Sequence, residues 1–173
     1  MSGPVAEDEP PPTGSAPAVL TSDERTVDDL DVDLAALGEL LSQVLADEGA
    51  PAGAESSLTL VDPHAIAALK RAHLDGDGSP TDVLSFPVDG VGDDAELIGD
   101  VVLCPAVAAE QAVDHAGSVE DELALLVVHG GLHLAGWDHA MPTDRAAMWD
   151  RERSLLSALH RAPARDPWGD RTS

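Results

Sequence analysis

Aromatic residues and cysteine are scarce in this sequence, and each shortage excludes something. With no tyrosine, one phenylalanine and three tryptophans, the chain must build its core mainly from Leu, Val, Ile and Ala. The single cysteine, Cys104, excludes an internal disulfide and is consistent with a reducing compartment. Because Cys104 lies in the apolar run V-V-L-C-P, we predict a small buried side chain rather than a reactive thiol.

Long apolar stretches and targeting signals are missing as well. No apolar run approaches the roughly 18–20 residues that a helix needs to span a bilayer. The N-terminal sequence M-S-G-P-V-A-E-D-E-P-P-P lacks the basic start and the apolar stretch of a secretory signal. These absences predict a soluble, intracellular protein without a membrane partner.

Basic residues are few, and they are unevenly distributed. Nine Lys and Arg stand against 33 Asp and Glu, which gives a net charge of −24. Such a field repels nucleic acid at long range, and we expect no DNA partner. No basic residue lies between Arg71 and Arg145, and six of the nine follow residue 144. If a polyanion binds, its positive contacts must come from a metal ion, the Lys70–Arg71 pair and the C-terminal arginines. Taken by itself, the cluster of C-terminal arginines is typical of a solvated helix face.

The order of the predicted elements indicates one α+β domain. A length of 173 residues is typical of a single domain. Residues 1–16 are predicted to be a disordered, acidic and Pro-rich tail, residues 17–160 the domain, and residues 161–173 a loose C-terminal tail. The apolar spacing predicts, in order, strand 16–21, helix 32–49, strand 57–61, a helix from Pro63, strands 83–87 and 97–103, and helices over 105–115, from Val119, and over 143–159. We therefore expect a small mixed sheet of about four strands covered by helices.

Three histidines, His129, His133 and His139, stand in the run H-G-G-L-H-L-A-G-W-D-H. On a helix, the first two lie on one face about one turn apart. Gly136 allows a sharp turn, because glycine reaches positive φ without steric cost, and the turn can bring His139 back towards the pair. Three converging neutral imidazoles bind one zinc ion and leave its fourth position open, as in catalytic sites. We expect the helix that carries the pair to be central and buried, which makes it a rigid mount.

A class of zinc proteases has the same histidine offsets. In those enzymes H-E-x-x-H is followed by a glycine and a third histidine. Here Gly130 follows the first histidine, so the glutamate that serves as general base is absent from its usual place. A zinc-dependent peptidase or amidase is therefore an alternative that the spacing permits and Gly130 disfavours.

Several further motifs accompany the histidines in a fixed order. They are P-T-D-V-L-S-F-P at 80–87, G-D at 99–100, and Met148 and Glu152 after the histidine run. With these motifs the chain resembles the YbeY family of single-domain, zinc-dependent bacterial endoribonucleases, over roughly residues 57–155. The resemblance implies a cytoplasmic enzyme that trims ribosomal RNA precursors near the 3′ end of the small-subunit RNA and supports ribosome quality control.

The resemblance also implies the components of the site. His129, His133 and His139 would bind one Zn²⁺, and single-stranded RNA would lie in a groove beside it, with ribosomal RNA and ribosome components as partners. Two nucleophiles are compatible with such a site, zinc-held hydroxide and the 2′-hydroxyl of the RNA itself. A non-catalytic ribosome-associated factor with a structural metal is a second alternative, which the lack of a fourth protein ligand in the motif disfavours.

One position departs from the family pattern. The family usually carries L-N-x-x-Y-R shortly before the T-D-V-L-S-F strand, and that arginine is implicated in activity. This chain has L-K-R-A-H-L at 69–74, so Leu74 takes the place of the arginine. We hypothesise that Arg71, about one turn earlier on the same helix face, supplies the positive charge in catalysis. The alternative is that Arg71 is only a surface residue.

Asp138, next to the third histidine, is the other candidate for a catalytic role. Two roles suit its carboxylate. It can orient a ligand histidine and fix its tautomer, or it can cap the local turn. The predicted site therefore consists of three histidine ligands with Arg71 and Asp138 beside them.

Overall fold

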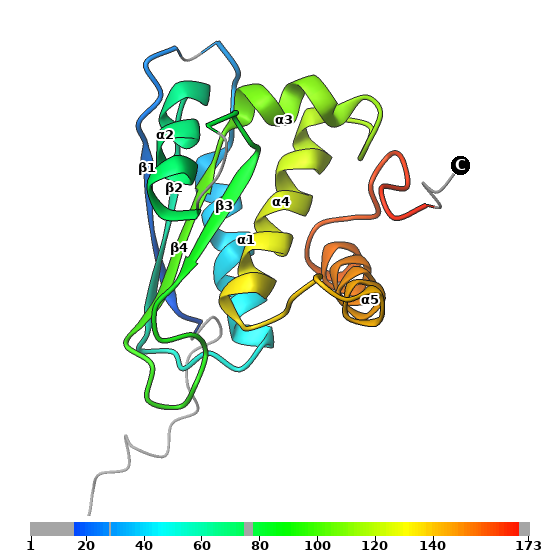
Figure 1. Ribbon diagram of the computed structural model, residues 1–173. Helices are drawn as coiled ribbons and strands as arrows, with labels where there is room; N and C mark the ends of the chain where they lie inside the picture. Colours follow the sequence, from blue (N-terminus) through cyan, green and yellow to red (C-terminus); the bar gives the residue numbers. More distant parts are fainter. Residues whose placement is uncertain (1–15, 28, 75–77, 170–173) are drawn as a thin grey trace, which may run out of the picture.

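The structure, a computed structural model, describes residues 16–27, 29–74 and 78–169 (Figure 1). The elements follow the predicted order, which confirms the α+β prediction, and their bounds are β1 Ala18–Asp23, α1 Leu34–Asp47, β2 Glu55–Leu60, α2 Pro63–Leu74, β3 Val83–Pro87, β4 Leu97–Leu103, α3 Pro105–Ala112, α4 Val119–Leu134 and α5 Pro142–Leu159. The predicted disordered tail, 1–16, lies outside the described residues except for its last residue.

One mixed sheet of four strands carries the fold, in the order β1-β2-β4-β3. β1, β2 and β4 run parallel, and β3 pairs antiparallel with β4. Parallel neighbours need a crossover connection, which α1 supplies between β1 and β2. The loop between β3 and β4 is held by Asp89, whose carboxylate accepts hydrogen bonds from the N–H groups of Glu96 and Leu97 at 3.0 and 2.9 Å.

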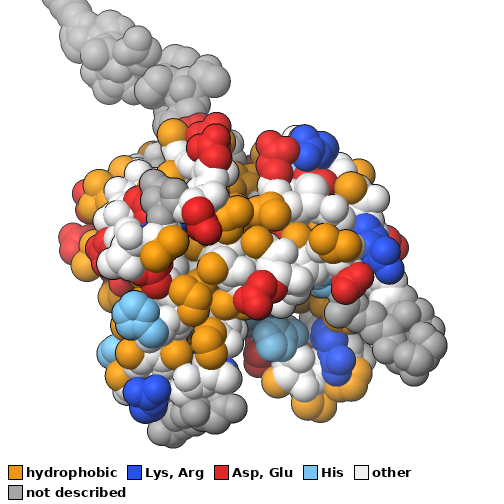
Figure 2. All heavy atoms as spheres, turned by 90° about the horizontal axis from the view of Figure 1, so that it is seen from above, with side chains coloured by type: hydrophobic (Ala, Val, Ile, Leu, Met, Phe, Trp, Pro, Cys, Tyr) orange, Lys and Arg blue, Asp and Glu red, His pale blue; other side chains and the backbone are white. Residues whose placement is uncertain are grey.

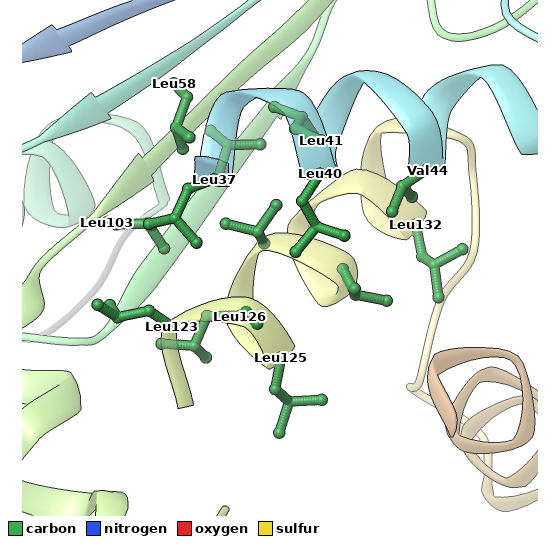
Figure 3. Packing of buried hydrophobic residues seen from close by; sticks show 14 of the residues in the cluster. Leu37, Leu40, Leu41, Val44, Leu58, Leu103, Leu123, Leu125, Leu126 and Leu132 are labelled. Carbon is green, nitrogen blue, oxygen red and sulfur yellow. The ribbon is translucent and has the colours of Figure 1, made fainter. Parts of the chain in front are cut away.

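Helices cover both faces of this sheet. α1 and α4 lie on one face, α2 lies on the other, and α5 packs on the outer side of α4 (Figure 1). The main core fills the space between the sheet, α1 and α4, where Leu41, Leu58 and Leu126 meet (Figure 3). A smaller cluster beneath α2 contains Ile66 and Cys104, so Cys104 is buried as predicted, and this burial raises the pKa of its thiol. None of the described helices combines the length and the apolar character that a membrane crossing requires.

α4 is buried along most of its length, as predicted, and two glycines allow its close packing. A Cβ at Gly130 would lie 3.0 Å from Val101 Cγ1 of β4, and one at Gly131 would lie 2.9 Å from Val44 Cγ1 of α1. Larger residues at these positions would push α4 away from its neighbours, because protein interiors are close-packed. The glycine pair therefore fixes the depth at which α4 lies.

The C-terminal segment differs from the prediction. Residues 161–173 are predicted to be loose, yet the described part, up to residue 169, packs back onto α4 and α5. The backbone N–H groups of Ala164 and Arg165 donate hydrogen bonds to α4 and to the loop before it, at 2.9 and 2.8 Å, and Trp168 is 8% exposed. These contacts offset the entropy cost of ordering a short segment, and the polar composition alone does not reveal them.

Candidate metal centre

Three histidine rings converge at the C-terminal end of α4. His129 and His133 project from the helix, and His139 returns from the loop after Gly136, whose φ of 101° provides the turn that the sequence predicts. One possible ligand atom from each ring lies within 4.8 Å of the other two. The two helical histidines are partly buried and His139 is exposed, so the cluster opens to the surface.

The two helical histidines are each held by a hydrogen bond at Nδ1. His129 Nδ1 donates to Glu152 Oε2 at 2.6 Å, and His133 Nδ1 donates to the carbonyl oxygen of Trp137 at 3.0 Å. A carbonyl and an ionised carboxylate can only accept hydrogen bonds, so in neutral rings both Nδ1 atoms carry the proton and both Nε2 atoms present lone pairs. These two Nε2 atoms are 3.1 Å apart.

This donor set fits a divalent metal ion. Two lone pairs at such a distance repel each other unless a cation lies beside both. Two nitrogen ligands at about 2.0–2.1 Å from a tetrahedral zinc are about 3.3 Å apart, close to the 3.1 Å between His129 and His133. Burial, with the charges of His129 and His139, lowers the pKa of His133, which favours the neutral form that a metal ligand needs.

A hollow of about 410 Å³ opens beside the three histidines. Its other walls come from the end of α2, from β3 and from the residues before β3: Leu74, Thr81, Asp82, Val83, Leu84, Ser85 and Pro87. Ser85 Oγ donates a hydrogen bond to the carbonyl of Gly130 at 3.3 Å and so ties β3 to α4. A larger hollow, of about 930 Å³, lies between α1 and the start of α4 and contains none of the three histidines. The chemistry of the lining, not the volume, marks the site.

Arg71 and Leu74 differ in their relation to this hollow. Leu74 lines it and is 49% exposed. Arg71 is not among the lining residues, and its guanidinium lies against Gly78, where an added Cβ would be 2.8 Å from Nη2. A role for Arg71 in catalysis therefore requires its side chain to swing from Gly78 towards the hollow, which Leu74 lines about one turn later on α2.

Asp138 makes the contact that a turn-capping role requires, and its role beside the histidines stays a prediction. Its Oδ1 accepts a hydrogen bond from the backbone N–H of His139 at 2.7 Å, which caps the turn. The Nδ1 partners of the helical rings are instead Glu152 and the carbonyl of Trp137. The sequence motif contains Glu152 but gives it no role, because its contact joins α5 to α4 across 23 residues.

Comparison with known proteins gives one consistent result. The family model described as endoribonuclease YbeY matches residues 22–160. Endoribonuclease YbeY of Salinispora tropica is 44% identical over 140 residues, which cover 74% of this chain and 88% of the relative. Its counterpart in Beutenbergia cavernae is 46% identical over 132 residues, covering 72% and 87%. The solution structure of TM1509 from Thermotoga maritima superposes with a TM-score of 0.56 at 27% identity, over 82% of this chain and 88% of that one.

Proposed function

Because this chain belongs to the endoribonuclease YbeY family, we propose that it is a zinc-dependent, single-strand-specific enzyme that matures the 3′ end of small-subunit ribosomal RNA and serves ribosome quality control. Membership of the family makes it a hydrolase that acts on RNA. The observation that carries the finer proposal is the convergence of His129, His133 and His139 within 4.8 Å of one another beside a hollow. Ribosomal RNA and ribosome components are the partners in this proposal.

In this proposal the three imidazoles bind one zinc ion. When bound, the ion supplies Lewis acidity towards a phosphoryl oxygen and lowers the pKa of water at its open position to about 7. Glu152 and the Trp137 carbonyl fix the tautomers of His129 and His133, so that both Nε2 atoms would be available to bind the ion. His139, from the loop, would supply the third ligand, and all three histidines line the hollow.

The shape of the site supports preference for a single strand. The histidines line a recess of about 410 Å³ rather than a ridge. A phosphodiester must enter this recess to reach the three histidines. A single strand can bend its backbone inwards and turn its bases out, whereas a paired strand must first leave its helix.

The charge of the protein gives RNA little long-range attraction. The net charge is −24, and acidic side chains are spread over the face seen in Figure 2, where Lys and Arg side chains are few. Phosphate contacts must therefore come from the metal ion and from a small number of cationic side chains. This makes any cation near the hollow important for cleavage.

Zinc-loaded protein is expected to cleave a single-stranded fragment of small-subunit ribosomal RNA and to leave casein intact. Chelation should abolish cleavage without unfolding, because the core between the sheet, α1 and α4 does not depend on the ion. Gel analysis of labelled RNA and of casein measures the activities, and circular dichroism measures the fold. Casein cleavage would favour the peptidase alternative, and unfolding on chelation would favour a structural metal in a non-catalytic factor.

The surroundings of Gly130 argue further against the peptidase alternative. A Cβ at this position would already lie 3.0 Å from Val101 Cγ1 and 3.3 Å from Ser85 Oγ. A glutamate, the general base of the proteases with this histidine spacing, would require these side chains to shift. The position that carries that base is thus tightly packed in this fold.

Arg71→Ala is expected to slow RNA cleavage about tenfold or more if Arg71 supplies the missing positive charge, because a donor to transition-state charge is typically worth a hundredfold or more. Arg71→Lys is the matched control, since it keeps the charge and should retain most of the rate. Single-turnover cleavage of the same RNA fragment by zinc-loaded protein measures both variants. An unchanged rate for Arg71→Ala would leave Arg71 as a surface residue.

A further inference from the structure

The described end of the chain forms a strap on α4 and α5, which we define as residues 164–169. Its first residues are fixed beside the start of α4. Ala164 N–H donates to the Asp121 carboxylate at 2.9 Å, and Arg165 N–H donates to a backbone carbonyl just before α4 at 2.8 Å. Gly117 makes this close approach possible, because a Cβ there would lie 2.9 Å from both Ala164 Cβ and Arg165 N.

The far end of the strap reaches the support of the metal centre. Trp168 Nε1–H donates to Glu152 Oε1 at 2.9 Å, and the other oxygen of that carboxylate accepts from His129 Nδ1 at 2.6 Å. Trp168 is 8% exposed and Glu152 is 3% exposed, so water does not readily replace either partner. The guanidinium of Arg153 lies over the indole, 5.0 Å from the ring centroid, and helps to hold it in place.

A buried carboxylate with both oxygens engaged has one favourable orientation. If the indole N–H is lost, Glu152 Oε1 becomes an unsatisfied buried acceptor. The carboxylate is then free to rotate away from His129. This rotation weakens the bond to His129 Nδ1, and that bond selects the tautomer whose Nε2 is available to a metal.

We propose that Trp168 is a positioning residue for His129, acting through Glu152, so that the strap sets the affinity of the three histidines for a divalent metal ion. The inference rests on one part of the proposed function, namely that the histidines bind a metal. It does not depend on the substrate being RNA. The last described residues of the chain are thereby coupled to the metal centre.

Trp168→Phe tests this inference, because phenylalanine keeps a buried ring and removes the N–H. Zinc affinity is measured by competition with a chromophoric chelator, and the ring nitrogens of His129 are followed by NMR in the metal-free protein. We expect zinc to bind about tenfold more weakly. This is the lower end of the loss of affinity that follows when a group supporting a metal ligand is changed. We also expect the His129 ring to populate both tautomers instead of one. Glu152→Gln, which alters the carboxylate itself, should weaken binding by about tenfold to a hundredfold.

The matched control is Trp149→Phe. Trp149 is a partly buried indole on α5, and no hydrogen bond from it to another described residue is found. This variant should bind zinc as the wild type does, and thermal unfolding without metal checks that both variants are folded.

Two results would overturn the positioning role. One is unchanged zinc affinity and an unchanged His129 tautomer in folded Trp168→Phe. The other, decisive even if that variant fails to fold, is unchanged zinc affinity in Glu152→Gln. A different result bears on the proposed function. Wild-type protein that binds zinc without cleaving RNA would refute the endoribonuclease proposal and leave the strap's role in place.

Discussion

Replacing His133 with alanine is expected to empty the metal centre and to slow RNA cleavage at least about a hundredfold. The Nε2 atom of His133 is 3.1 Å from that of His129, and its ring centroid is 4.9 Å from that of His139. Without His133 only two imidazoles remain, fewer than the three protein ligands of catalytic zinc sites. Changes to groups that merely support ligands already cost about 10–100-fold in metal affinity or activity, so the loss of a ligand costs at least as much.

Metal analysis of the purified variant and cleavage of a single-stranded ribosomal RNA fragment provide two independent measurements. His64→Ala is the matched control, because His64 is exposed at the start of α2 and does not line the hollow. It should retain both zinc and activity. Circular dichroism should show the same helix content for both variants, since α4 is stabilised by its buried apolar side chains. Retention of zinc and full activity in His133→Ala would show that these histidines are not the reaction centre.

The strands and helices can be predicted from this sequence because their signals are local. The predicted strands 83–87 and 97–103 coincide with β3 and β4, which are short apolar runs separated by a loop, the first of them ended by Pro87. The strand order β1-β2-β4-β3 has no such signal, because it depends on pairing between distant residues. Leu58 of β2 pairs with Val101 of β4, for example, although α2 and β3 lie between them in the sequence.

In the candidate site, too, local features can be predicted from the sequence and contacts between distant residues cannot. The three histidines fall within eleven residues, so a helical period and one glycine turn are enough to predict that they meet. Glu152 and Trp168 reach His129 only through the packing of α5 and the strap on α4. Composition favours a loose tail around Trp168, and one buried hydrogen bond reverses that expectation. The groups that orient the histidine rings therefore cannot be predicted from the sequence pattern.

Gly99→Ala is expected to lower the free energy of unfolding by about 2–4 kcal/mol, because it combines backbone strain with overpacking. Gly99, in the G-D motif on β4, has a φ of 153°, which residues with a Cβ rarely adopt. An added Cβ would lie 2.6 Å from the carbonyl oxygen of Phe86, 2.7 Å from Leu134 Cδ2 and 2.9 Å from Pro87 Cα. Two of these atoms are backbone atoms of β3, so a rotamer change cannot relieve the contact.

Gly92→Ala separates this steric effect from a general effect of replacing glycine. Gly92 lies in the exposed loop before β4, and a Cβ there would meet no other atom within 4 Å, so its stability should change by less than about 0.5 kcal/mol. Thermal unfolding measures both variants, and Gly99→Ala should melt about 5–15 °C lower. Pro87 lines the hollow and Leu134 follows His133, so relaxation around the new methyl group would also reach the metal centre. A Gly99→Ala variant that melts like Gly92→Ala would mean that β3 shifts freely against β4, and the wall of the hollow would then not be a rigid surface.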